Sequence, residues 1–264
     1  MSEVGERVSG RFTEKFTRKA EVYAKYRPSY PKDLLKILGV QIGFTKDKIV
    51  ADVGSGTGIL SKIFLDNGNF VYGIEPNNEM RSFAERDLSQ YAKFVSVNRA
   101  AENTGLPGDS IDLVTAGQAL HWFDREKARV EFARILKSSG YVMIVYNERK
   151  KEDGMMDDYD KIIDRNASKS ETPDIDAEYL TKFFDTKDYK EFIVPNEQVL
   201  DYDGLIGRAT SASYLPSRSD PGFDSLEKDL RKLYDTYQEN GKIVLRYDTI
   251  LFLGQIRGVN PMPS

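Results

Sequence analysis

The sequence of 264 residues contains no cysteine and a single histidine, His121. Without cysteine the chain has no disulfide framework, no thiolate metal site and no cysteine nucleophile. One imidazole also excludes catalytic metal sites built from two or three histidines, which leaves only oxygen-rich sites of the magnesium or calcium type. We therefore expect no transition-metal chemistry and assign no metal ligands.

The chain also lacks long apolar runs and an excess of basic charge. Nowhere do as many as about 18 apolar residues follow one another, and the first twenty residues alternate charge with single apolar residues. The 38 Lys and Arg stand against 42 Asp and Glu, for a net charge of −4, and no block is basic enough to neutralise nucleic-acid phosphates. We expect a cytoplasmic protein, monomeric or homodimeric, that binds neither membrane nor nucleic acid.

From Lys48 onward, strand patterns alternate with helix patterns. Strands are predicted over residues 49–54, 70–75, 93–98, 111–117 and 141–147. Helices are predicted over residues 57–67, 77–90 and 124–137, with Gly140 beyond the last of them. Strands separated by helical segments indicate right-handed crossovers and a mostly parallel sheet in an α/β domain.

Two helices are predicted before this core. Phe12, Phe16, Ala20 and Tyr23 recur every three or four residues, which indicates one face of a helix ending before Arg27. A second helix carries four apolar residues over 34–38 and is predicted to close at Gly39. We expect residues 1–40 to form a helical cap, either packed on the domain or acting as a lid, and residues 41–150 to form the core.

The composition changes after Glu148, where charged and polar residues dominate as far as about Lys190. This segment is predicted to be a charged helical insertion on the surface, with residues 148–160 forming a solvated face. A strand over 192–200, a helix over 224–240 and a strand over 243–256 complete the chain. We assign residues 151–264 to the same domain as the core.

The segment Asp52-Val-Gly54-Ser55-Gly56-Thr-Gly58 leaves a buried strand and opens a helix. Glycine lets the backbone turn sharply and approach a ligand at the carboxyl end of the strand. A dinucleotide site would require a small residue three positions after the second glycine, and Ile59 stands there instead. The pattern indicates a ligand loop and disfavours NAD or FAD.

Glu75 stands at the end of the next predicted strand, seventeen residues after Gly58. A carboxylate in that place accepts hydrogen bonds from both hydroxyls of a ribose, as in dinucleotide folds. Glu75 therefore indicates a nucleoside ligand without identifying it.

These motifs together resemble a known family. DVGSGTG followed by GIEPNNEM resembles the class I S-adenosylmethionine-dependent methyltransferases, and AAENTGLPGDSIDLVTAGQALHWFD is similar to the segment that covers the adenine in them. YAKYRPSYP, SYLP and a final strand with YDT narrow the likeness to the trans-aconitate methyltransferase-like, or type 11, group. The resemblance implies a Rossmann-like fold with a seven-stranded, mostly parallel sheet, helices on both faces and a final antiparallel strand pair.

The resemblance also assigns residues to the cofactor, S-adenosyl-L-methionine, which leaves as S-adenosyl-L-homocysteine. It implies that Gly54, Ser55, Gly56 and Gly58 lie under the methionine and ribose parts, that Asp52 faces the amino group, and that Glu75 holds the ribose. The other cofactor positions are Tyr23 and Arg27 at the carboxylate, Pro76, Met80, Ala101 and Glu102 around the adenine, and Gln118 and Ala119 near the sulfonium. Arg27 is chosen because a guanidinium fork suits a carboxylate.

His121 follows Gln118 by three residues, on the segment predicted to face the methyl donor. Three roles stay open for it: general base, lining of the cleft without proton transfer, and a structural role. The likeness places the acceptor pocket in residues 151–264, and the candidate acceptor contacts are Trp122, Arg208, Tyr214, Arg218, Arg246 and Tyr247.

The sequence therefore predicts a methyltransferase that acts on a small-molecule acceptor, with O-methylation of a carboxylate as the leading reaction. A carboxylate is already anionic and needs no base, which fits a chain with few titratable catalytic candidates. Three alternatives stay open: a noncatalytic nucleoside-binding protein, a C-methyltransferase acting on a quinone precursor, and a dinucleotide oxidoreductase.

Overall fold

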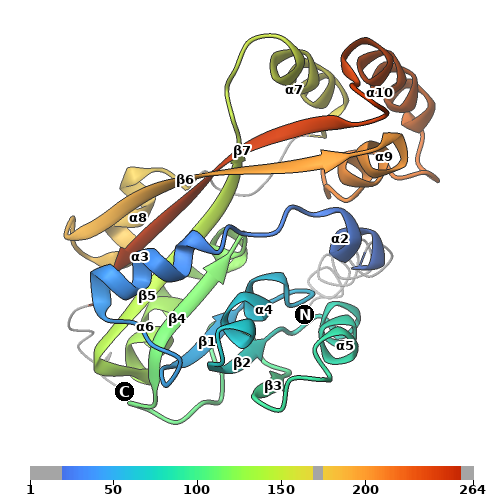
Figure 1. Ribbon diagram of the computed structural model, residues 1–264. Helices are drawn as coiled ribbons and strands as arrows, with labels where there is room; N and C mark the ends of the chain where they lie inside the picture. Colours follow the sequence, from blue (N-terminus) through green and yellow to red (C-terminus); the bar gives the residue numbers. More distant parts are fainter. Residues whose placement is uncertain (1–19, 169–174, 257–264) are drawn as a thin grey trace, which may run out of the picture. The chain divides into compact units, whose positions relative to one another are not determined.

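The computed structural model describes residues 20–168 and 175–256. Its strands form one sheet of order β3-β2-β1-β4-β5-β7-β6 (Figure 1). Strands β1 to β5 pair in parallel, and the arrows of β6 and β7 point in opposite directions in Figure 1. The bounds are β1 Ile49–Val53, β2 Phe70–Ile74, β3 Phe94–Val97, β4 Ile111–Gly117, β5 Leu136–Arg149, β6 Tyr189–Leu200 and β7 Ile243–Gly254. The predicted mixed sheet with a final antiparallel pair is confirmed.

Helices connect the strands. Their bounds are α2 Ala20–Tyr26, α3 Asp33–Ile42, α4 Ile59–Asp66, α5 Asn78–Asp87, α6 Arg125–Ile135, α7 Met155–Asn166, α8 Ala177–Phe184, α9 Tyr202–Thr210 and α10 Phe223–Tyr237, with a 3-10 turn η1 at Leu120–Trp122. None of the helices in the described residues is long and apolar enough to cross a membrane. Phe12 and Phe16 lie outside the described residues, so the predicted apolar face can be followed only from α2 onward.

Contacts divide the chain into two units. Of the described residues, 30–147, 175–194 and 249–256 form one, which we call the sheet unit. Residues 20–29, 148–168 and 195–248 form the other, which we call the helical unit. The predicted boundaries near residues 40 and 150 stay predictions.

Both faces of the parallel strands are buried in the sheet unit. Along β4, Val114 and Ala116 pack in one apolar cluster with residues of α6 and α8, whereas Leu113 packs in another with residues of α3, α4 and α5. Parallel strands covered on both faces have nearly continuous apolar sequences, as the burial of β4 illustrates. This packing fixes the carboxyl ends of β1, β2 and β4, from which the ligand loops start.

The helical unit has its own core, formed by the apolar sides of α7, α9 and α10 with part of β7. The prediction that residues 148–160 form a solvated face is wrong, because Met156 and Tyr159 are each 1% exposed. Apolar side chains at helical spacing turn this part of α7 inward, and Asp160 is buried in ion pairs with Arg149 and Lys151.

Two predicted helix ends are corrected, and one helix was not predicted. α3 continues through Gly39 and ends at Ile42, because Gly43 takes the left-handed C-cap conformation with φ 60°. α6 ends at Ile135, since Leu136 already pairs with Ile111 as the first residue of β5. Helix α9 had no counterpart in the prediction.

Candidate functional site

The glycine loop joins β1 to α4, and its three glycines have φ angles of 67°, 56° and 83°. A Cβ on Gly54 would lie 2.7 Å from the Ala119 side chain, and a Cβ on Gly58 would lie 2.7 Å from Leu88. A Cβ on Gly56 would meet nothing within 4 Å. Gly54 and Gly58 therefore allow close packing of the protein on itself, whereas Gly56 faces open space on the side where a ligand can approach.

Thr57, the next residue, is 3% exposed, and its Oγ1 has no hydrogen-bond partner among the described residues. A buried hydroxyl without a partner costs free energy, so such a group is explained best by a bound molecule or ordered water. The open side of Gly56 and the hydroxyl of Thr57 thus mark the same loop as a binding surface.

Glu75 follows β2 and holds the loop. Its Oε2 accepts a hydrogen bond from the Gly56 N–H at 2.9 Å, and its Oε1 accepts one from the Asn77 N–H at 2.8 Å. Burial raises the pKa of the Glu75 carboxyl, although these two backbone donors and Arg81 act in the opposite direction. Each carboxylate oxygen has a second lone pair, so Glu75 can still accept hydrogen bonds from two ligand hydroxyls.

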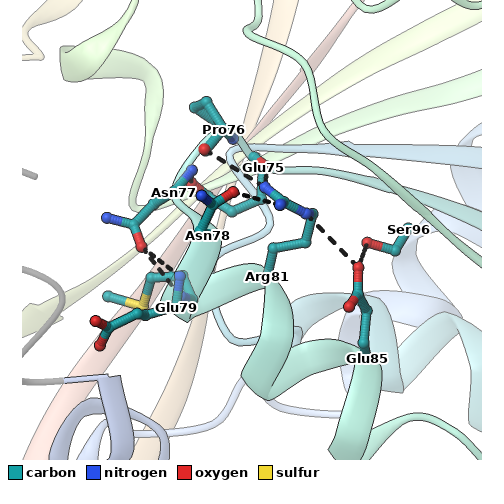
Figure 2. Close-up of polar contacts among 9 residues, drawn as sticks. Glu75, Pro76, Asn77, Asn78, Glu79, Arg81, Glu85 and Ser96 are labelled. Carbon is teal, nitrogen blue, oxygen red and sulfur yellow. Dashed lines mark hydrogen bonds and ion pairs between the residues drawn. The ribbon is translucent and has the colours of Figure 1, made fainter.

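Arg81 on α5 fastens the turn that carries Glu75 (Figure 2). Its Nη1 donates to the Glu75 carbonyl oxygen at 3.0 Å and its Nη2 to Asn78 Oδ1. The Arg81 Nε lies 3.6 Å from a Glu85 carboxylate oxygen, which also accepts a hydrogen bond from Ser96 on β3. Sequence reasoning missed Arg81, because its sequence pattern does not show that its side chain returns to the end of β2.

Pro76 and Met80, the predicted adenine contacts beyond Glu75, lie in this turn and in the first turn of α5. Pro76 is exposed and Met80 is 6% exposed. Asn77 caps α5, since its Oδ1 accepts from the backbone N–H groups of Glu79 and Met80. The cap holds the helix N-terminus next to Glu75.

Asp52 lies inside the protein, 1% exposed. Its two carboxylate oxygens accept hydrogen bonds from Ser61 Oγ at 2.6 Å and Thr115 Oγ1 at 3.0 Å. Burial raises the pKa of Asp52 to about 6, against the effect of the two hydroxyls. In the structure Asp52 joins α4 to β4 beneath the glycine loop, and its predicted contact with a cofactor amino group stays a prediction.

The loop after β3 contains Ala101 and Glu102. Ala101 is 4% exposed, and Glu102 Oε1 accepts a hydrogen bond from the Asp124 N–H at 2.8 Å. Two residues further on, the N–H and hydroxyl of Thr104 both donate to Glu131 Oε1 of α6, at 2.8 and 2.6 Å. The loop is therefore attached to α6 at both points.

Gln118 directly follows β4 and has φ 55°, a left-handed backbone that a residue with a side chain seldom adopts. Its N–H donates to the Val145 carbonyl at 2.9 Å and its Nε2 to the Asn147 carbonyl at 3.1 Å. Such strain persists where surrounding contacts hold it, often next to a ligand. The residue that follows, Ala119, is the one that contacts Gly54.

His121 and Trp122 belong to η1, directly after Ala119. Their rings lie 4.9 Å apart, and the His121 ring lies 6.2 Å from that of Tyr146. Trp122 is 46% exposed, which is unusual for so large an apolar side chain. The glycine loop and η1 thus meet on one end of the sheet unit.

The remaining predicted residues belong to the helical unit. Tyr23, Arg27, Arg208, Tyr214 and Tyr247 form one cluster, in which the Arg27 guanidinium lies 4.7 Å from the Tyr23 ring centre and Arg208 Nε donates to Tyr247 Oη at 3.0 Å. Arg218 and Arg246 lie elsewhere and are exposed, against Phe223 and Glu152. The sequence could not separate these two arginines from Arg208, because all three share a charge and differ only in burial.

Residues 51–144 match the profile of a family described as "Methyltransferase domain". This range contains the glycine loop, Glu75 and η1 in one sheet unit. Over these residues the chain carries a methyltransferase domain.

Relatives of this methyltransferase domain occur in distant organisms. A protein of Mycobacterium tuberculosis named as an uncharacterized methyltransferase is 32% identical over 55% of this chain and 57% of its own length. The chain therefore matches only a little more than half the length of that relative. A protein of Dictyostelium discoideum with a provisional methyltransferase name is 25% identical over 89% of this chain and 91% of its own.

Solved structures agree with the fold of the methyltransferase domain. A structure from Anaeromyxobacter dehalogenans, provisionally named a type II methyltransferase, has a TM-score of 0.63, with 20% identity over 88% of this chain and 98% of its own. The Bacillus subtilis YcgJ protein has a TM-score of 0.56 with 21% identity, over 85% of this chain and 98% of its own. At such identities these structures show a shared fold.

The cofactor of the methyltransferase domain is S-adenosylmethionine, and the loop fits it. The open side of Gly56 leaves room for a close approach, the orphan hydroxyl of Thr57 offers a hydrogen bond, and the Glu75 carboxylate keeps lone pairs for ribose hydroxyls. Among the residues that the structure describes, no group of three or more His, Cys, Asp or Glu could hold a metal ion.

Proposed function

We propose that this protein is an S-adenosylmethionine-dependent methyltransferase that transfers a methyl group to a carboxylate oxygen of a small molecule. The observation that carries the proposal is the glycine loop, in which Gly56 is open to a ligand while Glu75 holds its N–H. The sulfonium of the bound cofactor supplies an electrophilic methyl carbon, so the protein has to bind and orient rather than activate.

Different residues bind the ribose, the adenine and the sulfonium of the cofactor. Glu75 accepts hydrogen bonds from the ribose hydroxyls, and Arg81 keeps it in place through the Glu75 carbonyl. Pro76, Met80, Ala101 and Glu102 surround the adenine. Gln118 and Ala119 approach the sulfonium, and the left-handed backbone of Gln118 is the strained feature expected beside a reacting centre.

The acceptor residues Arg208, Tyr214 and Tyr247 support an anionic acceptor. A guanidinium and phenol hydroxyls recognise a carboxylate, and a carboxylate needs no general base before it attacks. With a carboxylate acceptor, His121 has no proton to remove and is not needed as a general base. Orientation of the two reactants supplies on the order of 7 to 11 kcal/mol of the barrier reduction.

Calorimetry with S-adenosylmethionine and S-adenosylhomocysteine tests the cofactor assignment. Glu75→Ala is expected to lower both affinities by about tenfold or more, because a charge-assisted hydrogen bond to ribose and the anchor of the Gly56 N–H are lost together. Glu79→Ala is the matched control, since it removes the same charge from an exposed position on α5. Equal affinities for wild type and Glu75→Ala would exclude this assignment.

Turnover with labelled cofactor tests the reaction itself. We expect base-labile methyl esters from a panel of small carboxylic acids, and no product from amines. Cofactor binding without turnover on any acid, amine or phenol supports the noncatalytic alternative, and a base-stable product on a quinone precursor supports carbon methylation. His121→Ala should leave the rate with carboxylic acids within about tenfold, whereas loss of a general base costs about 10²-fold or more.

A further inference from the structure

The helical unit holds two neighbouring arginines, the partly buried Arg27 and the buried Arg208, and neither contacts a carboxylate among the described residues. Arg208 is 5% exposed, and the groups acting on the charge of Arg27 are Tyr23, Arg208, Tyr214 and Tyr247. Within the described residues, neither Arg27 nor Arg208 has an ion pair. Buried charges are normally paired, because removing them from water is costly.

The polar contacts of both guanidiniums are incomplete. Arg27 Nη2 donates to the Ser211 carbonyl at 3.2 Å, while the buried Arg27 Nε has no partner among the described residues. Arg208 Nε donates to Tyr247 Oη at 3.0 Å. Both contacts are to uncharged oxygens, so the described part of the chain supplies no counter-ion for either guanidinium.

A third arginine nearby has its counter-ion. Arg149 forms an ion pair with Asp160, whose second carboxylate oxygen lies 3.0 Å from Lys151 Nζ. Arg149 Nη1 also donates to Tyr214 Oη at 3.3 Å. Asp160 thus pairs with Arg149 and Lys151, and it forms no ion pair with Arg27 or Arg208.

Tyr214 connects the three arginines. Burial alone would raise the pKa of its hydroxyl, but the charges of Arg149, Arg208 and Arg27 together hold the pKa below its ordinary value. The oxygen accepts from Arg149, so the Tyr214 O–H still has a proton to donate, with no acceptor for it in the described part of the chain. The hydroxyl is oriented as a donor by Arg149.

We propose that Arg27, Arg208 and the Tyr214 hydroxyl form a binding site for one doubly charged oxyanion, a phosphate monoester or a dicarboxylate. A ligand charge of −2 would balance the two unpaired guanidiniums. Their N–H groups and the O–H of Tyr214 would donate hydrogen bonds to the oxygens of the ligand. Arg149 and Asp160 act as positioning residues. That this anion is carried by the methyl acceptor rests on the proposed function; the binding itself does not.

The site is tested on the full chain in a chloride buffer. Calorimetry and thermal unfolding are measured with inorganic phosphate, glutarate and acetate at matched ionic strength. One equivalent of phosphate or glutarate should bind and raise the unfolding midpoint, with acetate at least about tenfold weaker because it leaves one guanidinium unpaired. Tighter binding of phosphate would indicate a phosphate monoester as the natural ligand, and tighter binding of glutarate would indicate a dicarboxylate. Equal binding of acetate and the dianions would overturn the assignment.

Variants locate the binding. Arg27→Gln and Arg208→Gln should each weaken the dianion by about tenfold or more, and Arg231→Gln, at an exposed arginine of the same unit, should leave it unchanged. If Arg208→Gln fails to fold, Tyr214→Phe removes only the donor hydroxyl and should weaken binding severalfold. Dianion binding that survives both Arg27→Gln and Tyr214→Phe would overturn the proposal.

A competition separates this site from the cofactor site. If S-adenosylhomocysteine displaces phosphate, Arg27 holds the cofactor carboxylate and the dianion site is wrong. If phosphate binds but S-adenosylmethionine does not, the proposed function fails while the anion site stands. If the enzyme forms methyl esters but neither phosphate nor glutarate binds, the proposed function stands and the anion site fails.

Discussion

At the scale of single residues, the three loop glycines share a backbone conformation and differ in purpose. Gly54 and Gly58 are required because Ala119 and Leu88 occupy the places where their Cβ atoms would lie. Gly56 has open space instead, and its N–H is held by Glu75. Of the three glycines, only Gly56 is therefore expected to be a position where a substitution weakens ligand binding without causing a clash inside the protein.

Gly56→Ala tests this difference, with Gly43→Ala as its match. Both glycines have φ near 60°, and a Cβ on either would meet no atom within 4 Å. Each substitution should lower the free energy of unfolding by about 1 kcal/mol through left-handed strain. Only Gly56→Ala should also weaken S-adenosylmethionine by about tenfold or more, measured by calorimetry. Equal affinities in both variants would show that no ligand approaches Gly56.

The sequence predicts the loop and Glu75 but not their supports. Glycine spacing and a carboxylate at a strand end are local patterns that depend on a few neighbouring residues. Thr57 and Arg81 acquire their roles from the fold, which brings their neighbours close or leaves a hydroxyl without a partner, so no local pattern marks them.

At the scale of elements, α6 holds the loop that follows β3. Glu131 is 7% exposed and accepts from the Thr104 N–H, the Thr104 hydroxyl and Arg134. These interactions hold the pKa of Glu131 below its ordinary value, although burial acts to raise it. The Glu131 carboxylate thus holds the loop after β3 at Thr104, where the loop backbone is not paired with a strand.

Glu131→Ala should lower the free energy of unfolding by about 2 to 3 kcal/mol, because the buried N–H and hydroxyl of Thr104 lose their acceptor. Affinity for S-adenosylmethionine should fall as well, since Ala101 and Glu102 lie on the loop that is released. Urea unfolding and calorimetry measure the two effects. Glu126→Ala, at an exposed position of the same helix, serves as control and should change neither.

Helix α2 packs on α9 through Gly207. A Cβ there would lie 2.4 Å from the Tyr26 ring, so Gly207→Ala should cost about 1 to 3 kcal/mol of stability. Gly39→Ala is the opposite case, because its Cβ would meet only one atom, at 3.9 Å, inside α3. It should stabilise by about 0.5 to 1 kcal/mol. Urea midpoints that move in the same direction for both variants would contradict the packing.

At the scale of the whole molecule, Asp52 makes stability depend on pH. Its pKa in the folded protein is about 6, against an ordinary value of 3.8. Between these values the folded protein holds a proton that the unfolded chain has released. The contribution of Asp52 is therefore most favourable below pH 3.8 and is lost as the pH rises to about 6, with a total of about 3 kcal/mol.

Asp52→Asn removes this dependence. The free energy of unfolding of the variant minus that of wild type should increase by up to about 3 kcal/mol between pH 4 and pH 7. Urea unfolding at several pH values measures the difference, and carboxyl groups that do not act on Asp52 cancel in the subtraction. Asp47→Asn, at an exposed position before β1, is the matched control. A flat difference for Asp52→Asn would show that its carboxyl titrates alike in both states.

The sequence by itself determined the strand and helix alternation, the glycine loop, Glu75 and the methyltransferase family, because each depends on the order and spacing of neighbouring residues. Tertiary structure alone decided which charges are buried and which are paired. Asp160 and Arg208 are ordinary charged residues in the sequence, yet Asp160 is paired with Arg149, whereas Arg208 has no counter-ion in the described part of the chain. Pairing depends on distances across the chain, and those distances exist only after folding.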